Sequence, residues 1–250
     1  MIDNISTYKN KAHPLIEFNT TCQDCSLGNT NKLNYTKAVR GAGPDDLTKV
    51  KLIVISDHPG FYECKSKYPF FDNQLATKPE ERSEWLNAGA LLRRSLNKLF
   101  NLDTYTDCWL TNVIKCEPGH NTMSSDHLKV CSKHLVNELH YLNMYCPTAP
   151  ILIAGNKAFK SFKSLVPGVI NEKSTLQELR RRSDLYYKNH HLCFTMNPAA
   201  ISKCEFRVEK EVYYYNNDVF VADYQSYPIL VGSPIWMWLE DLKILSEHFL

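Results

Sequence analysis

The sequence predicts an α/β fold, a three-layer α/β/α arrangement around a short, four-stranded parallel sheet. Four apolar runs rich in Val, Ile and Leu do not alternate with polar residues, which is typical of parallel strands buried on both faces. Segments with a helical spacing of apolar residues lie between these runs. Strand–helix alternation of this kind favours a parallel sheet with right-handed crossovers.

The predicted elements follow one another in a regular order. The strands are expected at residues 51–56, 108–113, 150–154 and 192–196. The helices are expected at residues 88–100, 124–142, 156–165 and 234–250. In the second helix apolar side chains recur every three or four positions, and Ser124 or Ser125 is expected to cap it. The last helix is amphipathic, with Trp236, Leu239, Leu242 and Leu245 on one face.

We expect one domain over residues 1–250, with polar insertions at about residues 72–87 and 204–233. An apolar fraction of 44% is enough for a core. The net charge of +2 gives no overall basic field, so a nucleic-acid surface would have to be a local patch. The sequence shows no apolar leader and no long apolar run, so we expect a cytoplasmic monomer with no membrane partner.

Each predicted strand ends in polar or glycine-containing sequence. These ends are residues 56–60, Thr111-Asn112, Gly155-Asn156 and residues 197–200. In open α/β sheets the ligand binds outside the carboxyl ends of the strands. The four ends therefore indicate a single crevice.

Four of the nine cysteines have a spacing that suits a metal site. Cys22 and Cys25 form a C-x2-C pair, while Cys116 closes a strand-end motif and Cys131 lies in a predicted helix. Thiolates in this pattern suit a four-cysteine metal or iron–sulfur site, with zinc or plain burial as the alternatives. The other five are expected to be buried as small apolar side chains: Cys64, Cys108, Cys146, Cys193 and Cys204.

Several linked motifs run through the chain between residues 22 and 203. After the C-x2-C pair come Ser56-Asp57-His58-Pro59-Gly60, Pro69-Phe70, Ala88-Gly89-Ala90-Leu91-Leu92, Thr111-Asn112-Val113-Ile114-Lys115-Cys116 and Asn197-Pro198-Ala199-Ala200. This order resembles the uracil-DNA glycosylase superfamily, in particular its iron–sulfur-containing family 4. Two positions depart from the family pattern, because Asp57 stands where the resemblance implies Glu and Asn197 where it implies His.

The resemblance implies hydrolysis of the bond between a flipped base and deoxyribose. Phe70 would stack on the base and Asn112 would read its edge, the alternatives being a core Phe and a strand-end cap. Asp57 would position a water and stabilise the cationic sugar, the alternative being a solvated loop Asp. Asn197 would donate a hydrogen bond to the leaving base, although unlike His it cannot become cationic.

The resemblance also implies contacts beyond the reacting bond. Backbone amides around His58 and Gly60 would hold a phosphate or a carbonyl oxygen. Basic residues late in the chain would contact the DNA backbone, the alternative being a solvated charge run; they are Arg180, Arg181 and Arg182. A structural [4Fe–4S] cluster would be held by Cys22, Cys25, Cys116 and Cys131.

The resulting hypothesis is a monofunctional DNA glycosylase that acts on a modified pyrimidine and leaves an abasic site. Asp57, Asn197 and the two insertions motivate it, because all would alter the pocket. The resemblance extends to members associated with defence against phages whose DNA carries bulky bases such as glucosylated hydroxymethylcytosine. The alternatives are a conventional uracil-DNA glycosylase in base excision repair and a non-catalytic binder of modified DNA.

Overall fold

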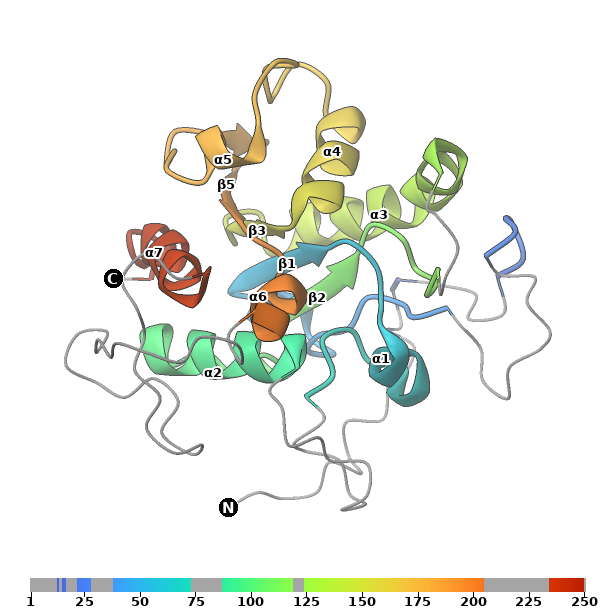
Figure 1. Ribbon diagram of the computed structural model, residues 1–250, viewed down its shortest axis with the longest axis horizontal. Coiled ribbons are helices and arrows are strands. Elements are labelled where there is room, and N and C mark those ends of the chain that lie inside the picture. Colours follow the sequence, from blue (N-terminus) through green and yellow to red (C-terminus); the bar gives the residue numbers. More distant parts are fainter. Residues whose placement is uncertain are drawn as a thin grey trace.

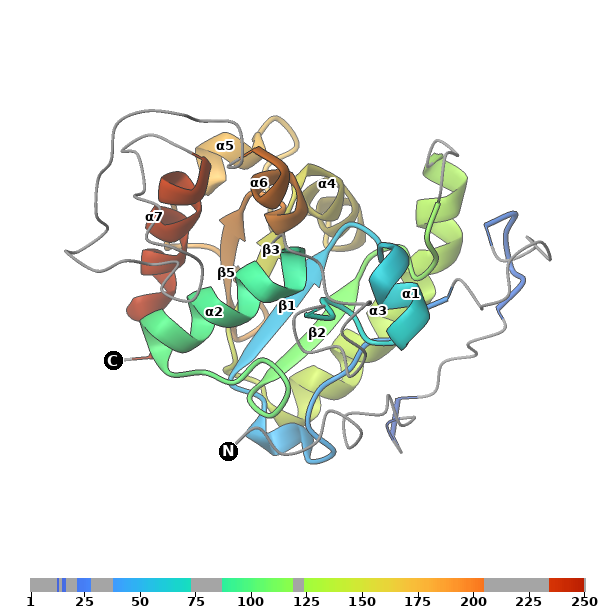
Figure 2. The same ribbon diagram turned by 60° about the horizontal axis from the view of Figure 1, so that its bottom comes forward.

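The central sheet has five strands in the order β2-β1-β3-β5-β4 (Figures 1 and 2). The computed structural model describes residues 13, 15–16, 22–27, 38–72, 87–118, 124–204 and 234–249. The strands are β1 Leu52–Ser56, β2 Cys108–Asn112, β3 Ile151–Ala154, β4 Tyr186–Tyr187 and β5 His190–Thr195. All pairings are parallel except the antiparallel pairing of β4 with β5.

The predicted α/β fold class is confirmed, and each of the four predicted strands is present. The predicted four-strand count was too low, since the two-residue strand β4 adds an edge to the sheet. A strand this short carries no pattern of its own and is defined only by its pairing with β5.

The helices have bounds close to the predicted ones where they are long. They are α1 Phe61–Ser66, α2 Ala88–Phe100, α3 Ser125–Tyr145, α4 Asn156–Leu165, α5 Leu176–Leu179, α6 Pro198–Cys204 and α7 Pro234–Ser246. Helix α3 is capped by Ser124, whose hydroxyl accepts from the His127 amide at 3.3 Å. The short helices α1, α5 and α6 were not predicted.

Alternate side chains along the strands enter two separate cores. Ile53 and Ile55 of β1 pack in the core that includes α3 and α4. Leu52 and Val54 of the same strand pack in the core that includes α2 and α7. Figures 1 and 2 show α3 and α4 on one side of the sheet and α2, α6 and α7 on the other. Burial on both faces explains why the strand sequences do not alternate.

The strand order contains a switch point between β1 and β3. From β1 the chain first adds β2 on one side of the sheet, and later adds β3 on the other side. Neighbouring crossovers therefore diverge at the carboxyl ends of β1 and β3, where open α/β sheets bind ligands. The residues that follow these two strands are Asp57 and Gly155.

A buried charged network fixes the segment that follows β2. The Lys115 ammonium lies 2.8 Å from Glu138 of α3 and 2.5 Å from the Thr111 hydroxyl, which in turn donates to Glu138 at 2.5 Å. The Gly41 amide donates to the same carboxylate at 3.2 Å. Because the charges are paired and hydrogen-bonded, the network ties residues 111–115 to α3.

The interiors of the two predicted insertions, residues 73–86 and 205–233, lie outside the described residues. The ends of the first one are held together. Asp72 pairs with Arg93 at 2.6 Å, and the Asn87 side chain donates to the Phe71 carbonyl at 2.7 Å. In the described part of the chain, no helix has the length and apolar character needed to cross a membrane.

Candidate active site

Asp57 and Asn197 meet in the crevice at the carboxyl end of the sheet. Asp57 follows β1 and is 9% exposed, while Asn197 follows β5. Asn197 Nδ2 donates to Asp57 Oδ2 at 2.9 Å, and the Ala158 amide in the first turn of α4 donates to Asp57 Oδ1 at 2.6 Å. Asn197 Oδ1 accepts from the Ala199 amide at 2.8 Å, so the same side chain caps α6. The carboxylate is thus fixed by two donors from two different strand ends.

Gly155 makes the close approach of these groups possible. Its φ of +110° lies in a region that side chains rarely adopt, and a Cβ there would lie 2.8 Å from Asp57 Oδ1. The same atom would lie 3.1 Å from Asn197 Cβ. The absence of a side chain at Gly155 therefore leaves room for the Asp57 carboxylate to reach the first turn of α4.

Asn112, at the end of β2, carries an unpaired donor. The residue is 2% exposed, and its Nδ2 has no hydrogen-bond partner among the described residues. The loops after β1 and β2 are joined beside it, since Ser56 and Asp57 carbonyls accept from the Val113 and Ile114 amides at 2.9 and 3.0 Å. Buried donors are almost always satisfied, so an unpaired one at a strand end indicates a place for a ligand acceptor.

Glu63 of α1 lies next to Asn112 and was not found from the sequence. Its carboxylate accepts from the Gly60 amide at 2.6 Å and from the Phe70 amide at 2.5 Å. Burial raises the pKa of Glu63 to about 7, against the lowering effect of these two amides, and the charge of Glu117 raises it further. The Asn112 amide group lies close enough to favour the carboxylate form, although its Nδ2 makes no hydrogen bond.

Phe70 is held in an unusual backbone conformation. Its φ is 54°, in the left-handed region that a bulky residue seldom occupies. Glu63 holds its amide, and Gly89 packs so closely that a Cβ there would lie 2.1 Å from the Phe70 carbonyl oxygen. The residue is only 5% exposed and belongs to the core that contains α2. A base could reach the ring face only after neighbouring groups open.

The backbone amides predicted to bind an anion are only partly available. The Gly60 amide is taken by the Glu63 carboxylate at the start of the six-residue helix α1, which is only one half of a capping box because Gly60 has no side chain. His58 Nδ1 lies 3.1 Å from the Pro59 carbonyl oxygen. The role of His58 and Gly60 in base binding stays a prediction.

The four predicted ligand cysteines lie near one another. The pKa of the Cys116 thiol is raised to about 12, mainly by burial and then by the neighbouring Cys131, Cys25 and Cys22. Contacts with α3 hold the segment 22–27 in place, because Asp24 pairs with Lys133 at 2.5 Å and Ser26 lies 2.8 Å from His127. Cys22, Asp24 and His134 also place their ligand-type atoms within 4.8 Å of one another.

Comparison with known proteins assigns the family. The chain matches the Uracil DNA glycosylase superfamily over residues 44–219, which is most of its length. The chain belongs to the uracil DNA glycosylase superfamily. Members of this superfamily are DNA glycosylases, so membership supports that class of activity and DNA as a partner. No curated protein matches the chain in a search of such proteins.

The superfamily match spans most of the residues just described. Asp57, Phe70, Asn112 and Asn197 all fall within residues 44–219, as do Cys116 and Cys131, whereas Cys22 and Cys25 precede the match. Some superfamily members bind a [4Fe–4S] cluster, and the described residues offer cysteine and histidine groups that could hold a metal. The placement within family 4 stays a prediction.

The three arginines predicted to contact DNA have different surroundings within this superfamily domain. Arg180 pairs with Asp241 of α7 at 2.7 Å, and Arg182 pairs with the neighbouring Asp184. Arg181 is exposed and makes no ion pair with the described residues. Among the described residues, Arg181 alone of the three has no ion-pair partner, and DNA contact by all three stays a prediction.

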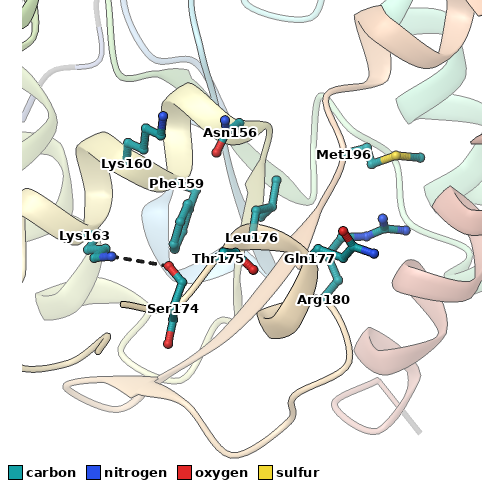
Figure 3. A pocket seen from close by; sticks show the side chains of 10 residues that line it. All are labelled: Asn156, Phe159, Lys160, Lys163, Ser174, Thr175, Leu176, Gln177, Arg180 and Met196. Carbon is teal, nitrogen blue, oxygen red and sulfur yellow. Dashed lines mark hydrogen bonds between the residues drawn. The ribbon is translucent and has the colours of Figure 1, made fainter. Parts of the chain in front are cut away.

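A cationic pocket of about 480 Å³ lies beside the crevice (Figure 3). Asn156 and Lys160 come from α4, Arg180 lies at the end of α5, and Met196 directly precedes Asn197. Figure 3 shows Lys163 donating to the Ser174 carbonyl, at 3.3 Å. This pocket could not be predicted from local sequence patterns, because residues from both α4 and α5 line it.

Glu63 did leave one signal in the sequence. It stands three residues after Gly60, the spacing at which a Glu carboxylate can accept from the backbone amide that precedes a helix. Helix α1 is too short for its periodicity to be recognised. Its second role, holding the Phe70 amide, depends on the turn at residues 67–70 and is not visible in the sequence.

Proposed function

We propose that the protein is a monofunctional DNA glycosylase that accepts a flipped pyrimidine between Phe70 and Asn112. The unpaired, buried Nδ2 of Asn112 is the observation that carries this proposal. A pyrimidine edge offers a carbonyl acceptor beside a ring N–H or exocyclic NH₂ donor, and an amide side chain can donate to the first while accepting from the second. Pairing this nitrogen with the base would recover the free energy that its burial costs, on the order of 1–3 kcal/mol.

Asp57 is the group proposed to act on the sugar. Its two hydrogen bonds, from Ala158 and Asn197, hold a carboxylate at the crevice and leave further acceptor positions for a water. A fixed negative charge near the sugar stabilises the positive charge that develops there as the bond to the base breaks. The attacking water would supply the oxygen that replaces the base, so that free base and an abasic site result.

Asn197 supports a substrate other than plain uracil. Its Nδ2 donates one of its two hydrogens to Asp57 and its Oδ1 accepts from the Ala199 amide, so a single neutral N–H is left to face a leaving base. A base that leaves without a cationic donor suits this arrangement better. We therefore propose a modified pyrimidine as substrate, for which a phage base such as glucosylated hydroxymethylcytosine is a candidate in antiphage defence.

A [4Fe–4S] cluster on Cys22, Cys25, Cys116 and Cys131 is part of the proposal. Four thiolates on one tetrahedral zinc ion would lie about 4 Å apart, given zinc–sulfur bonds of about 2.3 Å. Among the described residues no three of these sulfurs lie within 4.8 Å of one another, which suits a cluster that gives each thiolate its own iron. The cluster would fasten the segment 22–27 to the strand-end segment that presents Asn112, and the hydrolysis needs no electron transfer.

The experiment compares DNA substrates, two variants of the site and one control variant. Purified protein is incubated with phage DNA that carries glucosylated hydroxymethylcytosine, and with single-stranded and U:G oligonucleotides that carry uracil. Abasic sites are counted and the released base is identified by mass spectrometry. The wild-type protein should release the modified base, whereas Asn112→Leu and Asp57→Ala should not. The control Ser132→Ala should behave as wild type, because this half-buried hydroxyl donates to the Lys129 carbonyl within α3.

The outcomes separate the alternatives. Abasic sites only in uracil DNA would replace the modified-base proposal with uracil repair. Tight binding of modified DNA without release of any base would make the protein a non-catalytic binder. Because Asn112→Leu removes an unsatisfied donor, it should unfold at a temperature no lower than wild type, so that a loss of activity reports on base reading.

A further inference from the structure

Three metal-ligating side chains converge at the amino end of β5, away from the crevice. His191 and Cys193 come from β5, and His248 follows α7. Their ligand-type atoms all lie within 4.8 Å of one another. His191 Nδ1 lies 3.2 Å from Cys193 Sγ, and the two imidazole rings have centroids 3.9 Å apart. His191 and Cys193 are buried, whereas His248 lies at the surface.

The geometry of β5 and α7 explains why these residues meet. Residues 191 and 193 are two apart on a strand and therefore point to the same face of the sheet. Cys193 packs in the core that includes α7, so that face is covered by α7. The chain leaves α7 at Ser246, and the turn that follows brings His248 back over His191.

The tautomer of His191 is set by a backbone carbonyl. Its Nε2 lies at hydrogen-bonding distance from the Ser183 carbonyl oxygen, which can only accept. Nε2 therefore carries the hydrogen in the neutral ring, and Nδ1 presents a lone pair toward Cys193. Metal-binding histidines use this arrangement, with one ring nitrogen donating to a carbonyl and the other facing the metal.

The donor set matches a zinc ion. Zinc prefers imidazole nitrogen and thiolate sulfur in tetrahedral geometry, with bonds of about 2.0–2.1 and 2.3 Å. Those bonds place a nitrogen and a sulfur ligand about 3.6 Å apart. The observed 3.2 Å between Nδ1 and Sγ is reached from this value by a small side-chain movement. Glu247 lies close enough to act electrostatically on Cys193, and its carboxylate or a water would complete the coordination.

We propose that His191, Cys193 and His248 bind a zinc ion, separate from the four-cysteine group. Asn197 lies at the other end of the same strand, so the zinc ion takes no part in the reaction at Asp57. It would fasten the end of the chain to the sheet after α7 and stabilise the packing of that helix on β5. The alternative is a Cys193 thiol that donates to Nδ1 of His191, with the two imidazole rings in a tilted contact.

The test measures metal content in the full chain. Protein is purified from cells grown with added zinc, and zinc and iron are measured for wild type, His248→Ala, His140→Ala and Cys22→Ser. His248 and His140 are both exposed, so neither substitution disturbs the core, and His140 on α3 is the matched control. Wild type and His140→Ala should hold about one zinc per chain, whereas His248→Ala should lose it with its iron unchanged.

Two further measurements test whether Cys193 and His248 bind the metal. Zinc-free protein refilled with Co²⁺ should show a thiolate-to-cobalt charge-transfer band that Cys193→Ser lacks. If the buried variant Cys193→Ser does not fold, the zinc content of His248→Ala tests the site instead. A zinc chelator should lower the unfolding temperature of wild type but leave His248→Ala unchanged. The proposal is overturned if wild type holds no zinc, if His248→Ala keeps it, or if only Cys22→Ser loses it.

Discussion

Asn197 donates its side-chain amide hydrogen to the carboxylate of Asp57, at 2.9 Å, across 140 residues of sequence. The two residues follow β1 and β5, which are separated in the sheet by β3. Gly155, at the end of β3, leaves room for the contact between them. Residues at three strand ends therefore build the site. A substitution at Asp57 should also disturb the position of Asn197, and with it the α6 cap that Asn197 supplies.

Replacing Asp57 by Asn should destabilise the protein although the two side chains have the same shape. The carboxylate accepts from both Ala158 and Asn197, whereas an amide has only one accepting oxygen. If that oxygen still accepts from the Ala158 amide, the NH₂ group of the new Asn side chain faces the NH₂ group of Asn197. Asp57→Asn should lower the free energy of unfolding by about 1–3 kcal/mol in urea denaturation.

The double variant Asp57→Asn, Asn197→Asp should recover that stability. An aspartate at 197 accepts from the Ala199 amide with one oxygen and from the new amide at 57 with the other. The carboxylate is then on the wrong side of the crevice, so base release should stay lost. Equal loss of stability in the single and double variants would contradict the assigned hydrogen bonds, and recovered activity would contradict the role proposed for Asp57.

The sequence predicted the scaffold better than the contacts within the site. Apolar runs without alternation marked the strands, and α2 has its predicted bounds because Asn87 caps one end and Asn101 ends it in a left-handed conformation. The contact of Asp57 with Asn197 depends on strand order, which local patterns do not encode. Glu63 could not be assigned to the site from the sequence, because its contact with the Phe70 amide depends on how α1 and the turn before Phe70 are placed.

Lys115 should be far more important for stability than the exposed Lys133. Lys115→Met leaves the Glu138 carboxylate buried without a cation, and breaking a buried pair in this way costs about 3–5 kcal/mol. Lys133→Met removes a similar contact with Asp24 in solvent and should change stability little. Urea denaturation of both variants checks the difference, and equal effects would contradict the buried network.

Loss of the proposed cluster should loosen the N-terminal ligand segment without unfolding the sheet. Protein purified without oxygen should contain iron and sulfide in equal amounts, and Cys131→Ser should lose both. Hydrogen exchange should then rise in residues 22–27 and stay unchanged in β3. Cys146→Ser is the matched control, because this buried thiol only donates to the Leu142 carbonyl and should leave the iron content unchanged. Iron-free wild-type protein would contradict the cluster.

Glu63 should make the protein less stable as the pH rises from about 5 to 7. Its pKa is raised from an unfolded value of 4.5 to about 7, mainly by burial, so in this interval the folded chain holds a proton that the unfolded chain has released. Stability falls with rising pH wherever the folded state binds more protons, and the shift corresponds to roughly 3 kcal/mol. Above about pH 8 both states are ionised and this contribution is constant.

Glu63→Gln should remove that pH dependence, since an amide does not titrate. The variant should also lose about 1 kcal/mol at pH 5, because its single oxygen cannot accept from both the Gly60 and the Phe70 amides. Glu178→Gln is the matched control, because Glu178 likewise accepts from the amide that precedes its helix, α5, but is exposed, and its pKa is lowered by the Thr175 amide. That control should keep the wild-type slope between pH 5 and 8. Free energies of unfolding measured at four pH values decide the matter: if the Glu63→Gln and wild-type curves run parallel, Glu63 is not the titrating group.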